Sequence, residues 1–266
     1  MNLIKKEFKF NFKNLFIWII VITLFNLMFI SLSDIISEEN SAFMNLLKRM
    51  PKTFLDAFNM DPETLLRPEG MLGTEGMTFM FIFFGLYASM LASKLFAGEY
   101  DNKTIEYLLI KPYSRNKIFS HKVSIILINT IILFLVFLGT EFWFFNQFVE
   151  RDFSNNVLFA FALYLLVIEF FFAAIATLIS TLIKTRKLTN SISLGLLFFM
   201  YFGYTVTEGV QNTELLRKLS VFYYIPVRDT LKNETVYLLN SFIIIIIAFI
   251  VFFVSQKIFE KQDISV

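Results

Sequence analysis

Six stretches of the chain are too long and too apolar for the core of a soluble domain. A helix needs roughly 20 apolar residues to cross the hydrocarbon core of a bilayer, which is about 30 Å thick. The stretches are residues 15–32, 77–96, 123–145, 157–183, 191–207 and 236–255. Lipid offers no hydrogen bonds to the backbone, and the stretches lack the strict alternation of barrel strands. We therefore expect six membrane-spanning helices.

The composition supports this interpretation. Of the 266 residues, 56% are hydrophobic and 17% are charged, whereas soluble domains average about 25% charged residues. Cysteine is absent, which excludes a disulfide-stabilised secreted domain. The first apolar stretch is longer than that of a usual signal peptide and precedes a poor cleavage site, so we expect it to remain as a span. The predicted fold is a single all-α, polytopic transmembrane domain over residues 1–266.

The distribution of basic residues predicts the orientation. With six spans, both ends of the chain lie on the same side of the membrane, and that side carries most of the lysines and arginines. The positive-inside rule then places both termini in the cytosol. This asymmetry indicates membrane topology, and we see no case for nucleic-acid binding. Abundant Lys, Ile, Asn and Phe indicate an AT-rich bacterial genome and hence the plasma membrane.

The segment 2–13 is amphipathic. At helical spacing Ile4, Phe8, Phe12 and Leu15 share one stripe, and the lysines 5, 6, 9 and 13 lie opposite. This pattern predicts an interfacial helix on the cytosolic leaflet that leads into the first span. The alternative is a basic tail that only determines the topology.

The segment 97–122, between the second and third spans, contains a short helical pattern. Asp101 is a candidate cap for a helix over 102–110, and Pro112 ends that helix. The apolar patch of Ile105, Leu108 and Leu109 is too short to span a membrane, so it lies in the interface or docks in a groove of a partner. Ser114 is expected to cap the helix of the third span. The alternative is a loop that only joins two helices.

Two further segments are expected to lie on the outer side. In residues 33–76 the patterns predict short surface helices, one of them with Asp61 as cap and Pro62 at its first position. In residues 208–235 an aromatic stripe from Leu215 to Tyr224 ends before Pro226 and follows a short fifth span. This second pattern suggests a helix that re-enters the outer leaflet.

The sequence has no motif for catalysis. It contains no G-x-x-x-x-G-K-[ST] loop, no H-E-x-x-H and no G-x-S-x-G, and His121 is its only histidine. With cysteine also absent, zinc sites and thiol catalysis are excluded. We therefore expect no enzyme activity, no cofactor and no metal in this chain. Any ATP-driven work must use hydrolysis by another subunit.

Two acidic residues lie inside expected spans. Glu169 is near the middle of the fourth span and Glu141 is in the outer third of the third span. A carboxylate at the bilayer centre costs roughly 2.5–3.5 kcal/mol on insertion scales. The functional interpretation is that both line a translocation path between subunits and contact polar or cationic cargo. The alternative is that each is neutral or hydrogen-bonded to a neighbouring helix.

Three segments resemble one known family. The stretch GEYDNKTIEYLLIKPYSRNKIFSHK is similar to the first cytosolic loop of type-2 ATP-binding-cassette (ABC) transporter permeases, with the pattern G-E-x-x-x-x-T-x-E-x-L-L-x-x-P-x-S-R-x-x-x-x-x-K. MPKTFLDAFNMD and LRKLSVFYYIP also resemble stretches of these permeases, in the same order along the chain. The matching positions in the loop are Gly98, Glu99, Thr104, Glu106, Leu108, Leu109, Pro112, Ser114, Arg115 and Lys122.

The resemblance implies the permease subunit of an exporter. In such permeases the loop after the second span forms a coupling helix that sits in a cleft of a cytosolic ATP-binding subunit. It assigns ATPase coupling to Glu99, Thr104, Glu106, Leu108, Leu109, Pro112, Ser114 and Arg115. Two permease subunits, identical or related, and two ATPase subunits form the working unit.

The resemblance leaves some points open. Tyr100, Asn102 and Lys103 replace residues that are commonly small in the family, so the identity of the ATPase partner is undetermined, as is the cargo. The alternative function is a non-transporting membrane anchor or sensor that recruits a cytosolic partner. A secondary transporter is disfavoured because the chain shows no internal repeat.

Overall fold

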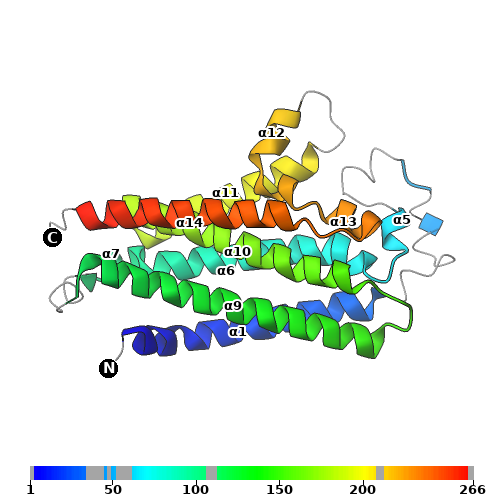
Figure 1. Cartoon of the computed structure of the whole chain (residues 1–266), viewed down its shortest axis with the longest axis horizontal. Coiled ribbons are helices and arrows are strands. Elements are labelled where there is room, and N and C mark those ends of the chain that lie inside the picture. The colour runs from blue at the N-terminus through cyan, green and yellow to red at the C-terminus, as the bar shows by residue number, and fades with distance from the viewer. Residues whose placement is uncertain are drawn as a thin grey trace.

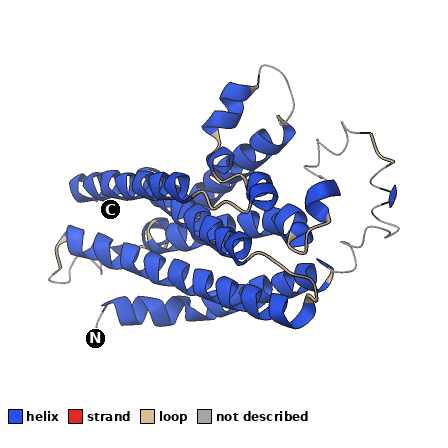
Figure 2. Ribbon diagram, turned by 45° about the vertical axis from the view of Figure 1, so that its right-hand side comes forward, coloured by secondary structure: helices blue, strands red, loops and turns tan. Residues whose placement is uncertain are grey.

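The computed structural model describes residues 3–33, 45–46, 49–51, 62–105, 113–207 and 213–262, and every regular element in these ranges is a helix (Figure 2). The expected all-α fold is therefore confirmed. The long helices lie side by side along one direction (Figure 1). They are α1 (Leu3–Ser31), α6 (Met77–Leu95), α9 (Arg115–Phe148), α10 (Asn155–Ile183), α11 (Arg186–Val206) and α14 (Leu238–Lys261).

Five of the six expected spans coincide with helices that are long and apolar enough to cross a membrane. Among the described residues these helices are Ile4–Ser31, Leu72–Leu95, Arg115–Phe148, Asn155–Ile183 and Leu238–Lys261. The remaining stretch, 191–207, falls in α11, which is helical but more polar and is not one of the five. The 21 residues of α11 give it a length of about 31 Å. A sixth crossing thus remains a prediction.

Both ends of the described chain lie at the same end of the bundle. Figure 1 shows the N- and C-termini beside α7 (Ala97–Asp101) and the start of α9, whereas α5 (Pro62–Leu65) and α13 (Val227–Asn233) lie at the opposite end. We call these the termini end and the α5 end. The shared location of the termini agrees with the topology expected from the sequence.

Helix α10 forms the centre of the bundle. In its most apolar stretch 78% of the residues are buried, compared with 28% for α1 and for α14. It packs against α6, α9, α11 and α14. Within a membrane such packing depends on close fit, since lipid tails are as apolar as leucine. One example is Gly85 of α6, where a Cβ atom would come within 2.5 Å of Cδ1 of Leu197 on α11.

Helix α1 packs mainly along α9 and meets α6 through aromatic rings. Trp18 and Phe25 each lie with their ring centroids within about 6 Å of Phe83 on α6. The amphipathic segment 2–13 is not a separate helix, because α1 runs unbroken from Leu3 to Ser31. The expected stripe is also corrected. Phe12 is 50% exposed, and the buried position at this level of the helix is Asn11.

The prediction that a helix begins at Asn102 and continues to residue 110 is wrong at its start. Asp101 ends α7, and Asn102 and Lys103 form a turn in which Lys103 is left-handed, with φ 54°. The amides of Lys103 and Thr104 donate to the carbonyls of Tyr100 and Glu99 at 3.0 and 2.9 Å. This is a Schellman motif, which ends a helix. Ile105 is helical but only 5% exposed, so it packs in the core of this chain and does not belong to an apolar patch available to lipid or a partner. Residues 106–112 lie outside the described residues, so that part of the expected helix is untested.

The segments at the α5 end follow the expectations in part. Pro62 is the first residue of α5, as expected, and a π-helix, η1 (Leu72–Gly76), precedes α6. Most of the expected short helices in residues 33–61 lie outside the described residues. The stripe from Leu215 to Tyr224 is not one helix but α12 (Glu214–Leu219) and the 3₁₀ helix η2 (Val221–Tyr224). Ser220 separates them, because its hydroxyl accepts a bond from the Phe222 amide and caps η2.

The location of the termini leads to a labelling prediction. The chain has no cysteine, so single cysteines introduced at exposed positions report on one site each. With an impermeant maleimide on intact cells, Asn156→Cys at the α5 end should react, and Asn102→Cys and Lys257→Cys at the termini end should not. Inside-out vesicles should give the reverse pattern. Reaction of Asn102→Cys on intact cells would contradict the orientation.

Candidate functional site

Three aromatic rings join three long helices at the termini end. Phe96 follows α6, Phe119 is on α9 and Phe259 is on α14, and all three are at most 2% exposed. Their ring centroids are 5.0 to 6.2 Å apart. Such aromatic contacts add packing energy beyond the buried area alone. These three rings pack α6, α9 and α14 closely together at the termini end.

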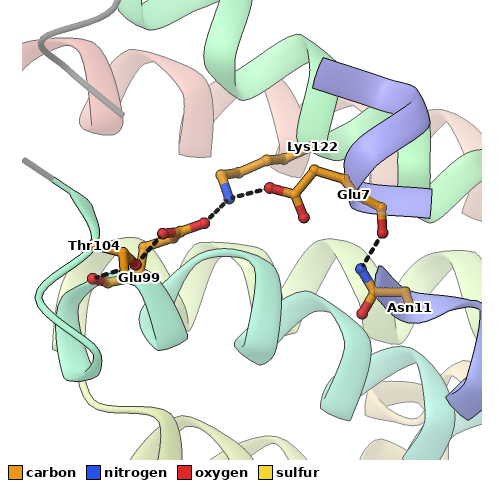
Figure 3. Close-up of polar contacts among 5 residues, drawn as sticks. All are labelled: Glu7, Asn11, Glu99, Thr104 and Lys122. Carbon is orange, nitrogen blue, oxygen red and sulfur yellow. Dashed lines mark hydrogen bonds and ion pairs between the residues drawn. The ribbon is translucent and has the colours of Figure 1, made fainter. Parts of the chain in front are cut away.

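A buried lysine lies beside this aromatic contact. The side chain of Lys122 on α9 is 1% exposed, and its Nζ lies 2.8 Å from Oε1 of Glu99 and 3.7 Å from Oε1 of Glu7 (Figure 3). The hydroxyl of Thr104 donates to the other oxygen of Glu99. We call Glu7, Glu99, Thr104 and Lys122 the Lys122 cluster. It connects α1, α7 with its following turn, and α9.

Local structure explains why these groups meet. Lys122 shares the buried face of α9 with Ile118, Phe119 and Ile125. The Schellman turn after α7 folds Thr104 back onto Glu99. A buried ammonium group costs several kcal/mol unless it is paired. Since the two carboxylates are 14% and 16% exposed, the cluster is a mostly dehydrated ion network, unlike a surface salt bridge.

Arg115 and Gln262 form a second group of contacts at the same end. The guanidinium of Arg115 donates to the carbonyls of Glu260 and Gln262 at 3.0 and 2.5 Å, and so caps the C-terminus of α14. The Tyr100 hydroxyl donates to the side chain of Gln262 at 3.0 Å, and Gln262 in turn donates to the carbonyl of Thr181 on α10. Burial raises the pKa of Tyr100 above its ordinary value.

Asp101 caps a different helix from the one expected. Its carboxylate accepts a hydrogen bond of 2.8 Å from the backbone amide of Arg186, at the N-terminus of α11. A carboxylate there satisfies a free amide and complements the helix dipole. The expected cap at Ser114 is confirmed, because its side chain accepts a bond from the Lys117 amide at the start of α9.

The structure brings together part of the set of coupling residues expected from the sequence. Glu99, Thr104, Ser114 and Arg115 all lie at the termini end. Glu106, Leu108, Leu109 and Pro112 lie outside the described residues. Sequence reasoning missed Glu7 altogether. Its signal was present, since Glu7 is the only acid in the basic segment 2–13.

The two acids within the spans are fully buried. Glu141 and Glu169 are both 0% exposed, and among the described residues neither carboxyl has a hydrogen-bond partner. Thr130 on α9 faces Glu169, outside hydrogen-bond geometry. Because both acids lie inside a single chain, neither faces a space between subunits in this conformation. Their role in a translocation path remains a prediction.

A second ion network lies at the α5 end. Arg67 pairs with Glu234 at 2.5 Å and with the buried Glu69 at 3.6 Å. Glu69 also accepts a bond from the amide of Ser154, the residue that precedes α10. The hydrogen bond from Arg67 holds the pKa of Glu234 below its usual range. Ion networks thus lie at both ends of the bundle.

The described residues contain no group of three or more His, Asp or Glu side chains that could hold a metal ion. The Lys122 cluster carries a lysine between its two acids, so it is suited to holding helices together.

A family model described as ABC-2 family transporter protein matches residues 1–264. The match covers nearly the whole chain. A search of curated proteins finds no match.

The Lys122 cluster leads to a stability prediction. Lys122→Met keeps the length of the side chain but leaves two carboxylates without their cation, and should lower the free energy of unfolding by about 3 kcal/mol. Lys117→Met, at an exposed position on the same helix, is the matched control and should have little effect. Thermal unfolding in detergent micelles measures both. Equal melting temperatures for the two variants would show that the cluster contributes nothing.

Glu169 should behave in the opposite way. A buried polar group without a partner typically costs about 1 to 3 kcal/mol, so Glu169→Leu should raise the melting temperature. Glu214→Leu, at an exposed position, serves as the control and should leave it nearly unchanged. A clear fall for Glu169→Leu would show that this carboxyl is stabilised by its surroundings.

Proposed function

The chain belongs to the ABC-2 transporter family and is a membrane permease component of an ABC transporter, and we propose that it exports its cargo when driven by a separate ATP-hydrolysing subunit. We call residues 99–115, which connect α7 to α9, the coupling segment. The observation that supports this proposal is that the first residues of this segment are ion-paired to α9. Glu99 and Thr104 hold the start of the segment against α9 through Lys122. Motion of the segment would therefore reach the long helices.

Residues 106–112 form the contact with the ATPase subunit in this proposal. Leu108 and Leu109 supply an apolar surface for a groove on that subunit, and Glu106 and Pro112 complete the motif. Arg115 and Ser114 fix the far end of the segment, because they cap α14 and α9. When the ATPase subunits close on ATP, the segment moves with them and shifts the helices as packed bodies.

ATP hydrolysis belongs to the partner. The sequence has no loop of the kind that holds ATP phosphates, and ABC-2 permeases are typically non-catalytic. We propose that the termini end faces the cytosol of a bacterial cell, since most of the basic residues lie on that side of the predicted topology.

The working unit contains a second permease subunit, identical or related. Helix α11 supports this part of the proposal, because it exposes Ser191 and Gly195 four residues apart on a helix that is more polar than the other long helices. Small residues at this spacing allow close approach of another helix in lipid. Cargo passes between the two subunits, and Glu169 and Glu141 contact it when the helices around them part.

The alternative is a membrane anchor or sensor that recruits a cytosolic partner and moves nothing. It uses the same segment and the same contacts. ATP-dependent export by the complex distinguishes the two, because an anchor gives partner binding without export.

The coupling contact is tested by removing its apolar character. Leu108→Asp and Leu109→Asp should each abolish co-purification of the ATPase subunit, since a carboxylate in an apolar groove costs several kcal/mol. Leu215→Asp makes the same change at a leucine that is 78% exposed on α12 and should leave the complex intact. Retention of the ATPase subunit by both segment variants would contradict the proposed contact.

A further inference from the structure

Helix α1 has two kinds of contact with the α6–α7 unit. Between Trp18 and Phe29, large rings fill the space between α1 and α6. At the termini end, by contrast, Glu7 reaches α7 through Lys122, which also bonds Glu99. A further contact there places the Lys94 ammonium 4.4 Å from the ring of Phe10. Phe10 is 71% exposed, so this cation–π contact is weak.

We propose that Glu7 is a positioning residue for coupling. Glu7 and Glu99 both pair with Lys122. Through this shared lysine, Glu7 makes α1 move together with Glu99 and Thr104, at the start of the coupling segment. This inference rests on the proposed function, because it concerns how motion from an ATPase subunit enters the bundle.

The burial of Lys122 is the first argument. With 1% of its side chain exposed, the ammonium cannot exchange a lost carboxylate for water. Glu99 is the closer partner of Lys122, at 2.8 Å against 3.7 Å for Glu7. If Glu99 is displaced, Lys122 follows it, and the pair with Glu7 then pulls on α1. Surface ion pairs lack this property, because solvent replaces the partner at little cost.

The geometry of α1 is the second argument. The side chain of Asn11 donates to the carbonyl of Glu7 at 2.9 Å (Figure 3), within a single helix of 29 residues. Such a helix is about 43 Å long. Near its far end Phe29 stacks on Phe79 and lies against Gly76, the last residue of η1.

The contact of Phe29 with Gly76 and Phe79 shows which element a motion of α1 would reach. Inside or beside an α-helix, a π-helical turn often marks a functional site, and η1 directly precedes α6. Displacement of Glu7 would therefore reach the α5 end along α1, separately from any motion carried along α6. Through the Lys122 cluster and α1, motion of the coupling segment at the termini end would reach the α5 end.

The test uses the full chain purified with its ATPase subunit in lipid nanodiscs. Glu7→Gln keeps the size of the side chain and removes its charge. We expect its ATP hydrolysis rate at saturating ATP to fall about fivefold, equivalent to about 1 kcal/mol, with the KM for ATP unchanged. Glu7→Asp should recover part of the rate. Glu214→Gln, at an exposed acid on α12, should hydrolyse ATP like the wild type.

A distance measurement separates coupling from stability. Spin labels on Lys9→Cys and Asn102→Cys report the distance between α1 and the turn after α7. In the otherwise wild-type chain this distance should stay the same without nucleotide and with ATP plus vanadate. With Glu7→Gln added, it should differ between the two states.

Two results would overturn the inference. One is wild-type hydrolysis by Glu7→Gln. The other is an unchanged label distance in that variant in both states, which, together with a lower melting temperature, would assign Glu7 a structural role only. If no ATPase subunit co-purifies with the wild-type chain, the proposed function itself fails, and this inference with it.

Discussion

The constraint on which the rest of the structure depends is that lipid cannot hydrogen-bond to a peptide group. Every backbone amide and carbonyl at membrane depth needs a partner in its own segment, and the α-helix is the structure that provides one. The described long helices meet this requirement. Among the described residues, the ion pairs that join different elements lie at the ends of the bundle, where helices stop and their last backbone groups need caps. The ion networks around Lys122 and Arg67 lie at these ends.

The buried acidic and basic residues of the long helices, Lys122, Glu141 and Glu169, differ in what surrounds them. Lys122 is buried with two carboxylates beside it, so its removal leaves a charge imbalance and its presence ties three elements together. Glu141 and Glu169 are buried without hydrogen-bond partners among the described residues. Groups kept at such a cost within a membrane are functional candidates by default.

Local sequence signals succeeded where a single helix determines the outcome. Ser114 caps α9 as expected, and the stretch expected over 157–183 became α10, Asn155–Ile183. They failed where a neighbouring element decides. Asp101 has the chemistry of a cap but caps α11, because the start of α11 lies beside the end of α7. Phe12 is apolar yet exposed, because packing on α9 selects the face of α1 that contains Asn11.

The sequence by itself determined that the chain is a helical membrane protein and to which family it is similar. It also determined which loops carry most of the basic residues. These properties depend on local composition and period, which neighbouring residues carry regardless of the fold. Only the tertiary structure decided that Glu7, Glu99 and Lys122 meet, because they come from three segments separated by up to 115 residues. No local period records such a contact. It arises when α1 packs along α9 and the turn after α7 folds back beside them.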